Sequence, residues 1–249
     1  MSKIKVSIVS YLNSKPFIYG LQHHNIIKDI ELSLDTPADC ANKLLNGTVD
    51  LGLIPVAVIP EMEAPHIITN FCIGAVGAVH SVMLYSKVPM REITHVYLDS
   101  QSRTSVQLTK VLAKNYWSIS PTWLDTKEGF EQLIDNTAAA VVIGDRALAL
   151  AGKHEYAYDL AEEWQGFTDL PFTFACWVSN KLLPDTFIIQ FNEACALGVN
   201  NIDKVISEYK NQYPASFDIE NYLKHHISYD FSIKKKQAMG AFWDFTAKL

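Results

Sequence analysis

The order of strand and helix signals in the first third of the chain constrains its fold more than any other feature. Residues 4–9 alternate and are rich in β-branched side chains, which predicts a strand, and Ser14 and Pro16 suit the start of a helix that runs to about Leu21. The pattern then predicts a strand at 30–34, a helix from Pro37 to Gly47 and a short buried strand at 50–55. A β-α-β-α-β order indicates a parallel sheet covered by helices.

The rest of the chain predicts a second lobe. Strands are expected at 67–68, 81–85, 94–98, 138–143 and 173–178, and helices at 102–115, at 129–134 and from Gly144 onward. From Pro184 to Leu249 the pattern is mostly helical, with Gly198 and Pro214 as expected breaks. We therefore predict an α/β fold of two lobes with a ligand cleft. Lobe 1 would comprise residues 1–85 and 176–249 and lobe 2 residues 86–175, with crossings near 81–86 and 172–179.

The turn from Ser10 to Pro16 is a candidate ligand-binding turn, because ligands of open α/β sheets lie beyond the carboxyl ends of the strands. The amide of Asn13 can both donate to and accept from a ligand, or it can bond to its own backbone. Tyr11 can stack on a flat ligand ring or pack in the core. Lys15 is expected to face solvent.

The segment Asp99–Ser105 is the stronger anion-binding candidate, because four hydroxyl residues and one arginine precede an amphipathic helix. A helix N-terminus offers free N–H groups and a partial positive charge. We predict that Ser102, Thr104 and Ser105 hold a carboxylate together with backbone N–H groups, the alternative being plain helix capping. Arg103 either pairs with that carboxylate or lies on the surface.

Two further positions are candidates for the site. Ser81 starts an apolar strand after His80, and because adjacent strand residues point to opposite faces, we expect Ser81 to form hydrogen bonds and not to act as a nucleophile. The Gly144-Asp145 turn is a third junction between a strand and a helix. Asp145 either accepts a bond from a ligand hydroxyl or caps the helix.

Composition and motifs exclude several classes of function. The net charge of −6 disfavours general nucleic-acid binding. The four cysteines form no C-x-x-C pair or zinc-site spacing, and the sequence has no P-loop or dinucleotide fingerprint, so we predict neither a metal nor a cofactor. No signal-peptide or membrane-span pattern is seen, which predicts a cytoplasmic protein without a membrane partner. The oligomeric state is left open, a homodimer included.

Several segments closely resemble the chorismate dehydratase family of the futalosine route to menaquinone. Residues 6–16 (VSIVSYLNSKP) match its opening, and residues 50–55, 81–89 and 98–105 also resemble it, as do 143–145 and 170–177. The resemblance covers most of the chain in the family's order. Residues 74–79 (GAVGAV) depart from a more polar family segment, which leaves any ligand role of this segment and of His80 in doubt.

The resemblance implies a two-lobed fold of the periplasmic-binding-protein-like type (type II) used as an enzyme, a hydro-lyase that converts chorismate to 3-[(1-carboxyvinyl)oxy]benzoate and water. It also implies that Asn13 and Ser81 are catalytic. Ser10, Tyr11, Ser102, Arg103, Thr104, Ser105, Gly144 and Asp145 are the expected substrate-binding residues. Two rivals remain open, a non-catalytic small-anion binder of the same fold and the related dihydroxynaphthoate synthase. The general base is not identified.

Overall fold

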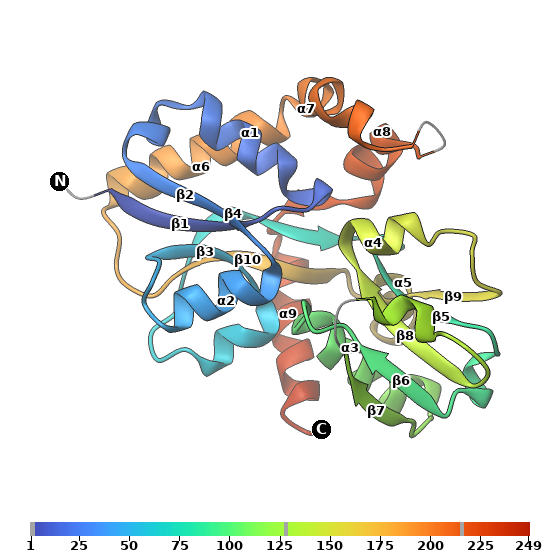
Figure 1. Ribbon diagram of the computed structural model, residues 1–249. Helices are drawn as coiled ribbons and strands as arrows, with labels where there is room; N and C mark the ends of the chain where they lie inside the picture. Colours follow the sequence, from blue (N-terminus) through green and yellow to red (C-terminus); the bar gives the residue numbers. More distant parts are fainter. Residues whose placement is uncertain (1–2, 127–128, 215–216) are drawn as a thin grey trace. The chain divides into compact units, whose positions relative to one another are not determined.

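The computed structural model describes residues 3–126, 129–214 and 217–249 (Figure 1). The chain forms two compact units, each made of two segments. Unit 1 comprises Met1–Gly74 and Thr173–Ser232, and unit 2 comprises Ala75–Phe172 and Ile233–Leu249. Each unit contains one mixed β-sheet and its own helices, so the α/β class predicted from the sequence is confirmed.

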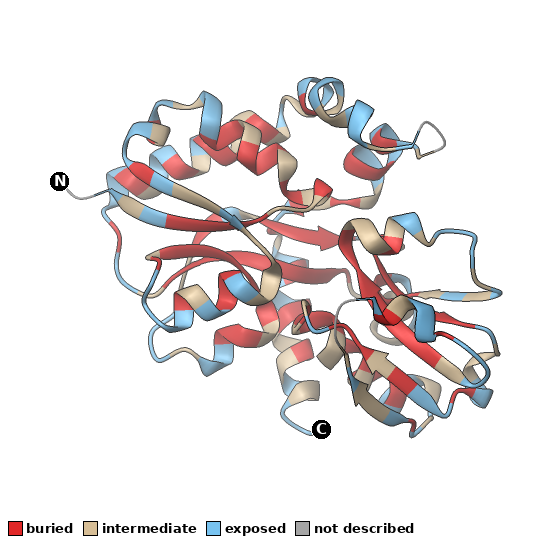
Figure 2. Ribbon diagram, viewed as in Figure 1, coloured by how far each residue is buried: buried red, intermediate tan, exposed pale blue. Residues whose placement is uncertain are grey.

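The sheet of unit 1 has the strand order β11-β4-β10-β3-β1-β2. Its strands are β1 (Ile4–Val9), β2 (Ile30–Asp35), β3 (Leu51–Pro55), β4 (His66–Ala75), β10 (Phe172–Ser179) and β11 (Ser228–Asp230). The pairs β1/β2 and β1/β3 are parallel, as the β-α-β-α-β pattern predicts, while β10 runs antiparallel to β3. Strands β3 and β10 are buried along their whole length (Figure 2), which explains their continuous apolar sequences.

The helices of unit 1 are α1 (Lys15–His23), α2 (Pro37–Leu45), α6 (Asp185–Val199), α7 (Ile202–Tyr209) and the single turn α8 (Ile219–Asn221). Helices α1 and α6 pack closely because a glycine on each, Gly20 and Gly198, faces the backbone of the other. The predicted helix break at Gly198 is confirmed to within one residue, because α6 ends at Val199 and α7 begins at Ile202. The glycine lies inside α6, where a side chain would overlap with the carbonyl oxygen of Pro16.

The sheet of unit 2 has the order β7-β6-β8-β5-β9. Its strands are β5 (Val82–Ser86), β6 (His95–Leu98), β7 (Thr122–Asp125), β8 (Ala138–Ile143) and β9 (Tyr156–Asp159). Strand β6 is parallel to β7 and β8, whereas β5 runs antiparallel to β8 and β9. This arrangement brings the start of β5 beside the end of β8, because Val82 pairs with Ile143. Residues before β5 and after β8 therefore meet at one edge.

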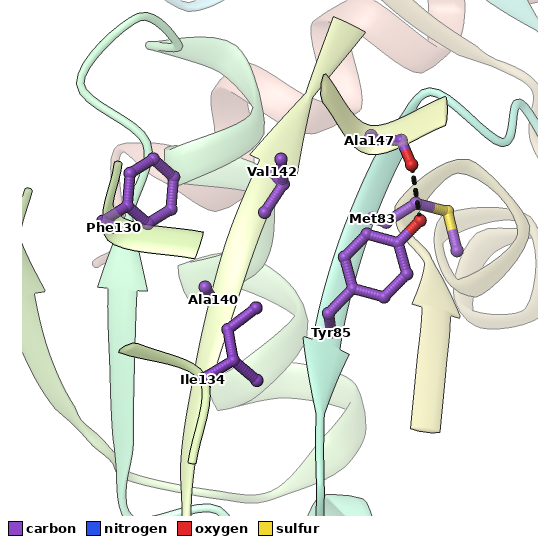
Figure 3. Close-up of a cluster of buried hydrophobic side chains, with 7 residues drawn as sticks. All are labelled: Met83, Tyr85, Phe130, Ile134, Ala140, Val142 and Ala147. Atoms are coloured by element: carbon purple, nitrogen blue, oxygen red, sulfur yellow. Dashed lines mark hydrogen bonds between the residues drawn. The ribbon is translucent and has the colours of Figure 1, made fainter. Parts of the chain in front are cut away.

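The helices of unit 2 are α3 (Thr104–Leu112), α4 (Gly144–Ala149), α5 (Leu160–Thr168) and α9 (Ile233–Thr246). One face of β5 and β8 is covered by a buried apolar cluster (Figure 3), made of Met83, Tyr85, Phe130, Ile134, Ala140, Val142 and Ala147. The hydroxyl of Tyr85 donates to the carbonyl oxygen of Ala147 at 2.8 Å. The only strongly polar atom of this cluster thus fixes the end of β5 to α4.

The two units differ from the predicted lobes in their boundaries. Helix α9 follows unit 1 in the sequence but belongs to unit 2. The reason is aromatic packing, since Phe242 contacts Trp164 and Phe172 at ring-centroid distances of 6.2 and 5.3 Å. The first boundary also falls earlier than predicted, at Gly74/Ala75, because the strand β4 ends there.

In unit 1 the carboxylate of Asp35, at the end of β2, joins side chains of β1, β2 and α2. It accepts bonds from Lys43 at 2.6 Å and from the hydroxyls of Ser7 and Ser33 at 2.7 Å each. The Asp35 carbonyl oxygen accepts the N–H of Ser10 at 3.0 Å. Burial raises the pKa of Asp35, but the bonds from Lys43, Ser7 and Ser33 outweigh this effect, and the net pKa lies below the ordinary value.

We predict that Gly198→Ala destabilises unit 1 by about 1–3 kcal/mol, because the added methyl group overlaps with the backbone of α1 and this overpacking outweighs the helix propensity of alanine. Urea unfolding followed by circular dichroism measures the change. Gly240→Ala is the matched control, since its methyl group would meet nothing within 4 Å and should stabilise α9 by up to about 1 kcal/mol. Equal effects of the two substitutions would contradict the proposed close packing.

We predict that Asp35→Asn lowers the free energy of unfolding by about 1 kcal/mol at neutral pH and by progressively less in acid. A carboxyl whose pKa is lowered by folding stabilises the protein above its unfolded pKa of about 3.9, and this contribution is lost as the pH falls through the folded pKa. Urea unfolding of the wild type and the variant across this pH range measures the difference. A difference that stays constant from neutral pH into acid would show that Asp35 contributes through packing and not through its charge.

Candidate functional site

In the Ser10 turn of unit 1, half-buried and buried residues alternate along the chain. Leu12 and Ser14 are buried, while Tyr11 and Asn13 between them are half-buried. Residues Leu12–Ser14 form a short 3-10 helix that runs directly into α1, with Pro16 in the first turn as predicted. The turn is thus anchored from below and leaves Tyr11 and Asn13 at its accessible side.

The side chain of Asn13 is bonded through its oxygen to the next residue, and its NH₂ group remains available as a donor. Its Oδ1 accepts the hydroxyl of Ser14 at 3.1 Å, so Ser14 stands at the N-cap of α1 but does not cap it with its side chain. Within the described residues the amide NH₂ of Asn13 donates to no group. Lys15, expected to face solvent, is half-buried and places its ammonium 4.9 Å from the centre of the Tyr209 ring. The Asn13 amide is therefore oriented, with two donors left for a ligand.

In unit 2 Ser81 has a buried hydroxyl that the protein does not satisfy. The side chain is 1% exposed, and its Oγ has no hydrogen-bond partner among the described residues. Four other buried side-chain atoms of the described chain share this property, but none belongs to a residue predicted for the site. Because an unmade buried hydrogen bond costs free energy, such an atom indicates a place for a ligand or water.

The segment before Ser81 is fixed by Asp159, which the sequence analysis did not identify. The backbone N–H groups of Val79 and His80 donate to Oδ2 of Asp159 at 2.8 and 2.5 Å, while Oδ1 caps the start of α5. Burial raises the pKa of Asp159, and the four backbone N–H bonds act in the opposite direction. His80 adopts a left-handed conformation with φ of 61°, and its side chain is exposed. Ser81 therefore enters β5 from a clamped backbone.

The turn after β6 is capped by its own serine. The hydroxyl of Ser102 accepts the N–H of Ser105 at 3.1 Å, which is the capping alternative, and it removes this N–H from the set available to an anion. Ser102, Thr104 and Ser105 are all buried, while Arg103 is half-buried. Their roles toward a carboxylate stay a prediction.

The turn after β8 lies beside Ser81. Gly144 adopts φ of 64°, which a side chain would disfavour, and its N–H donates to the carbonyl oxygen of Ser81 at 2.8 Å. Asp145 stands in the first turn of α4 and is half-buried. Within unit 2 the structure thus brings Ser81, Gly144 and Asp145 together.

Asp99 joins this group to the turn after β6. Its carboxylate accepts the N–H of Gln101 on one turn, and the N–H of Ile143 and the guanidinium of Arg146 on the other. The sequence places Asp99 in a candidate turn but gives it no role, because two of its partners, Ile143 and Arg146, lie more than 40 positions away. All site residues predicted in unit 2 therefore lie at the end of the sheet where β6 and β8 finish and β5 begins.

The described residues contain no group of three or more histidine, cysteine or acidic side chains that could hold a metal ion. The four cysteines are free and buried, and burial raises the pKa of Cys40 to about 12. That thiol is therefore neutral and a poor nucleophile. Within the same part of the chain, no helix has the length and apolar character needed to cross a bilayer.

Solved structures with the same fold include several binding proteins. A protein of Archaeoglobus fulgidus superposes with a TM-score of 0.76 at 15% identity, covering 99% of this chain and 97% of its own. A Candida albicans protein with the generic periplasmic binding protein fold gives a TM-score of 0.64 at 11% identity, with 100% and 91% covered. The periplasmic aliphatic sulphonate binding protein of Escherichia coli gives 0.61 at 15% identity, with 100% and 86% covered. These likenesses confirm the periplasmic-binding-protein-like fold.

Sequence comparison gives a closer relation. A chorismate dehydratase of Thermus thermophilus is 28% identical over 198 residues, which cover 68% of this chain and 72% of that protein. The model of a family described as menaquinone biosynthesis matches residues 4–248. Since this match takes in both units almost completely, the chain belongs to the menaquinone biosynthesis family.

Proposed function

We propose that the protein is a cytoplasmic chorismate dehydratase of the futalosine pathway, a hydro-lyase that forms 3-[(1-carboxyvinyl)oxy]benzoate and water. The observation that carries this proposal is the similarity to the Thermus thermophilus chorismate dehydratase over 198 residues. The family match supports the general role, and the unsatisfied Ser81 hydroxyl supports a ligand at the predicted place.

The proposed reaction needs a positioned substrate more than a reactive side chain. The ring carbon that bears the enolpyruvyl ether loses its proton, and the charge spreads through the diene into the ring carboxylate. The neighbouring hydroxyl then leaves and takes up a proton as water, and the ring becomes aromatic, which supplies the driving force. The base is either a protein group or the carboxylate of the substrate's own side chain.

The residues present suit these steps. The Asn13 amide offers two donors, and the Ser81 hydroxyl offers one buried donor and an acceptor. We propose that both orient the leaving hydroxyl and the enolpyruvyl group. The hydroxyl groups of the turn after β6, with the remaining N–H groups at the start of α3, would stabilise the charge that builds on the ring carboxylate.

We expect purified protein to convert chorismate into an aromatic product with a new ultraviolet band, and Ser81→Ala to lower kcat/KM at least about 100-fold. Because Ser81 Oγ makes no bond within the described protein, its removal should change the free energy of unfolding by less than about 1 kcal/mol. Ser86→Ala is the matched control, since Ser86 is a fully buried serine at the other end of β5 and should keep its activity.

Asn13→Ala is expected to lower kcat/KM by a similar factor, with Asn201→Ala as its control. Asn201 donates to the carbonyl oxygen of Leu197 at 2.8 Å in α6 and belongs to no predicted site. Folded Asn13→Ala and Ser81→Ala proteins that turn over chorismate at the wild-type rate would contradict the assignment of these two residues to the active site. Saturable chorismate binding without turnover by the wild type would instead favour the non-catalytic binder.

A further inference from the structure

The side chain of Asp99 is completely removed from solvent and lies where the ladder between β6 and β8 ends. The last residue of β8, Ile143, donates its N–H to Oδ2 of Asp99 at 3.2 Å in place of a strand partner. Oδ1 accepts the N–H of Gln101 at 3.0 Å, and the Asp99 carbonyl oxygen accepts the N–H of Ser102 at 3.0 Å. One residue therefore bonds to the backbone of two turns that are distant in the sequence.

Arg146 completes the arrangement from the α4 side. One guanidinium nitrogen donates to Asp99 at 2.6 Å and another donates to Glu131 at 2.7 Å, while the group lies 5.6 Å from the centre of the Phe130 ring. A buried carboxylate is costly unless it is paired and hydrogen-bonded, and Asp99 meets both conditions. The planar fork of arginine spans two carboxylates, which a lysine ammonium cannot do in the same geometry.

The charge balance argues against Arg146 as the group that binds a substrate carboxylate. Its single positive charge faces two carboxylates at hydrogen-bond distance, so the group as a whole does not attract an anion. What it does is fix the first turn of α4 against the turn after β6. The start of β5 is joined to these two turns as well, because Gly144, next to Ile143, donates its N–H to the carbonyl oxygen of Ser81.

We propose that Asp99 is a positioning residue for the substrate, acting through Ile143 and Arg146 on three segments: the Ser102–Ser105 turn, the Gly144-Asp145 turn and the start of β5 at Ser81. This inference rests on the proposed function for its kinetic consequence but not for its structural one. Small displacements of orienting groups lower rates strongly, by about 100-fold for a shift near 1 Å. An asparagine at position 99 would present an NH₂ group to N–H donors on one side and could not satisfy both turns.

The test compares Asp99→Asn and Arg146→Lys with Asp50→Asn. Asp50 accepts the N–H of Lys5 at 2.9 Å and the ammonium of Lys181 at 2.5 Å, so it has the same chemistry. It lies at the start of β3 beside the start of β1, at the opposite end of the unit 1 sheet from the Ser10 turn. Asp50→Asn is expected to leave kcat and KM for chorismate unchanged.

We expect Asp99→Asn and Arg146→Lys each to raise KM and to lower kcat, with a loss of about 10- to 100-fold in kcat/KM. The double variant should be little worse than either single variant, because Asp99 and Arg146 form one ion pair, called the clamp below, and act through it together. A merely structural role would lower the thermal midpoint and the active fraction but leave the KM of the folded molecules unchanged. That result would overturn the proposal. Arg146→Lys keeps the charge, so it decides the question if Asp99→Asn does not fold.

Hydrogen exchange provides a readout that is independent of activity. In both the Asp99→Asn and the Arg146→Lys protein the amides of 101–105 and 143–146 should exchange at least about tenfold faster, while those of β5, of β9 and of residues 138–142 in β8 keep their protection. Unchanged exchange in these two turns would overturn the clamp. If the wild type fails to turn over chorismate, the proposed function fails by that result alone, and the exchange data still decide the clamp.

Discussion

A carboxylate without access to water must find its hydrogen bonds within the protein, and Asp99 finds them in two turns at once. Where parallel strands end, the backbone N–H groups lose their ladder partners, so each turn needs an acceptor. Asp35 serves this purpose in unit 1 through its carbonyl oxygen, and Asp159 serves it before Ser81. The candidate ligand contacts of unit 2 thus stand on turns whose backbone N–H groups donate to acidic side chains.

This arrangement gives Ser81 its significance. Around it, Asp159 accepts the N–H groups of the two preceding residues and the N–H of Gly144 donates to the Ser81 carbonyl oxygen, whereas the Ser81 hydroxyl has no partner among the described residues. A side chain that is rigidly placed and unsatisfied is organised for a partner that the protein does not supply. A flexible serine at the surface would give no such indication, because water would satisfy it.

The sequence predicts the elements that depend on local patterns and misses those that depend on distant partners. The sequence predicts strands β1, β2, β3 and β8 to within one residue, because β1 and β2 alternate while β3 and β8 are continuous apolar runs that end at Pro55 and before Gly144. Strands β7, β9 and β11 have only three or four residues and carry no detectable period. The sequence predicts the break beside Gly198 but not the close contact of this glycine with α1, because a lone glycine has the same local signature at a break and at a close helix contact.

The site shows the same division. The sequence predicts the Ser10, Ser102 and Gly144 turns because small and hydroxyl residues follow strands there. Within unit 2 the structure brings the Gly144 turn beside Ser81. Asp99 and Arg146 were not assigned, since a buried ion pair across 47 positions leaves no local pattern.

An elimination that ends in an aromatic ring makes a modest demand on reactive side chains and a strict one on geometry, because the leaving hydroxyl and the departing proton must both be aligned with the diene. The periplasmic-binding-protein-like fold does not by itself specify catalysis, so under the proposed function the turns that carry Ser81 and Ser102–Ser105 must hold the substrate in place. The step from binding to turnover then lies in how exactly those turns are fixed. Under this proposal Asp99 and Arg146 contribute to the reaction without touching the substrate, because they fix the turns that carry the proposed substrate-orienting groups of unit 2.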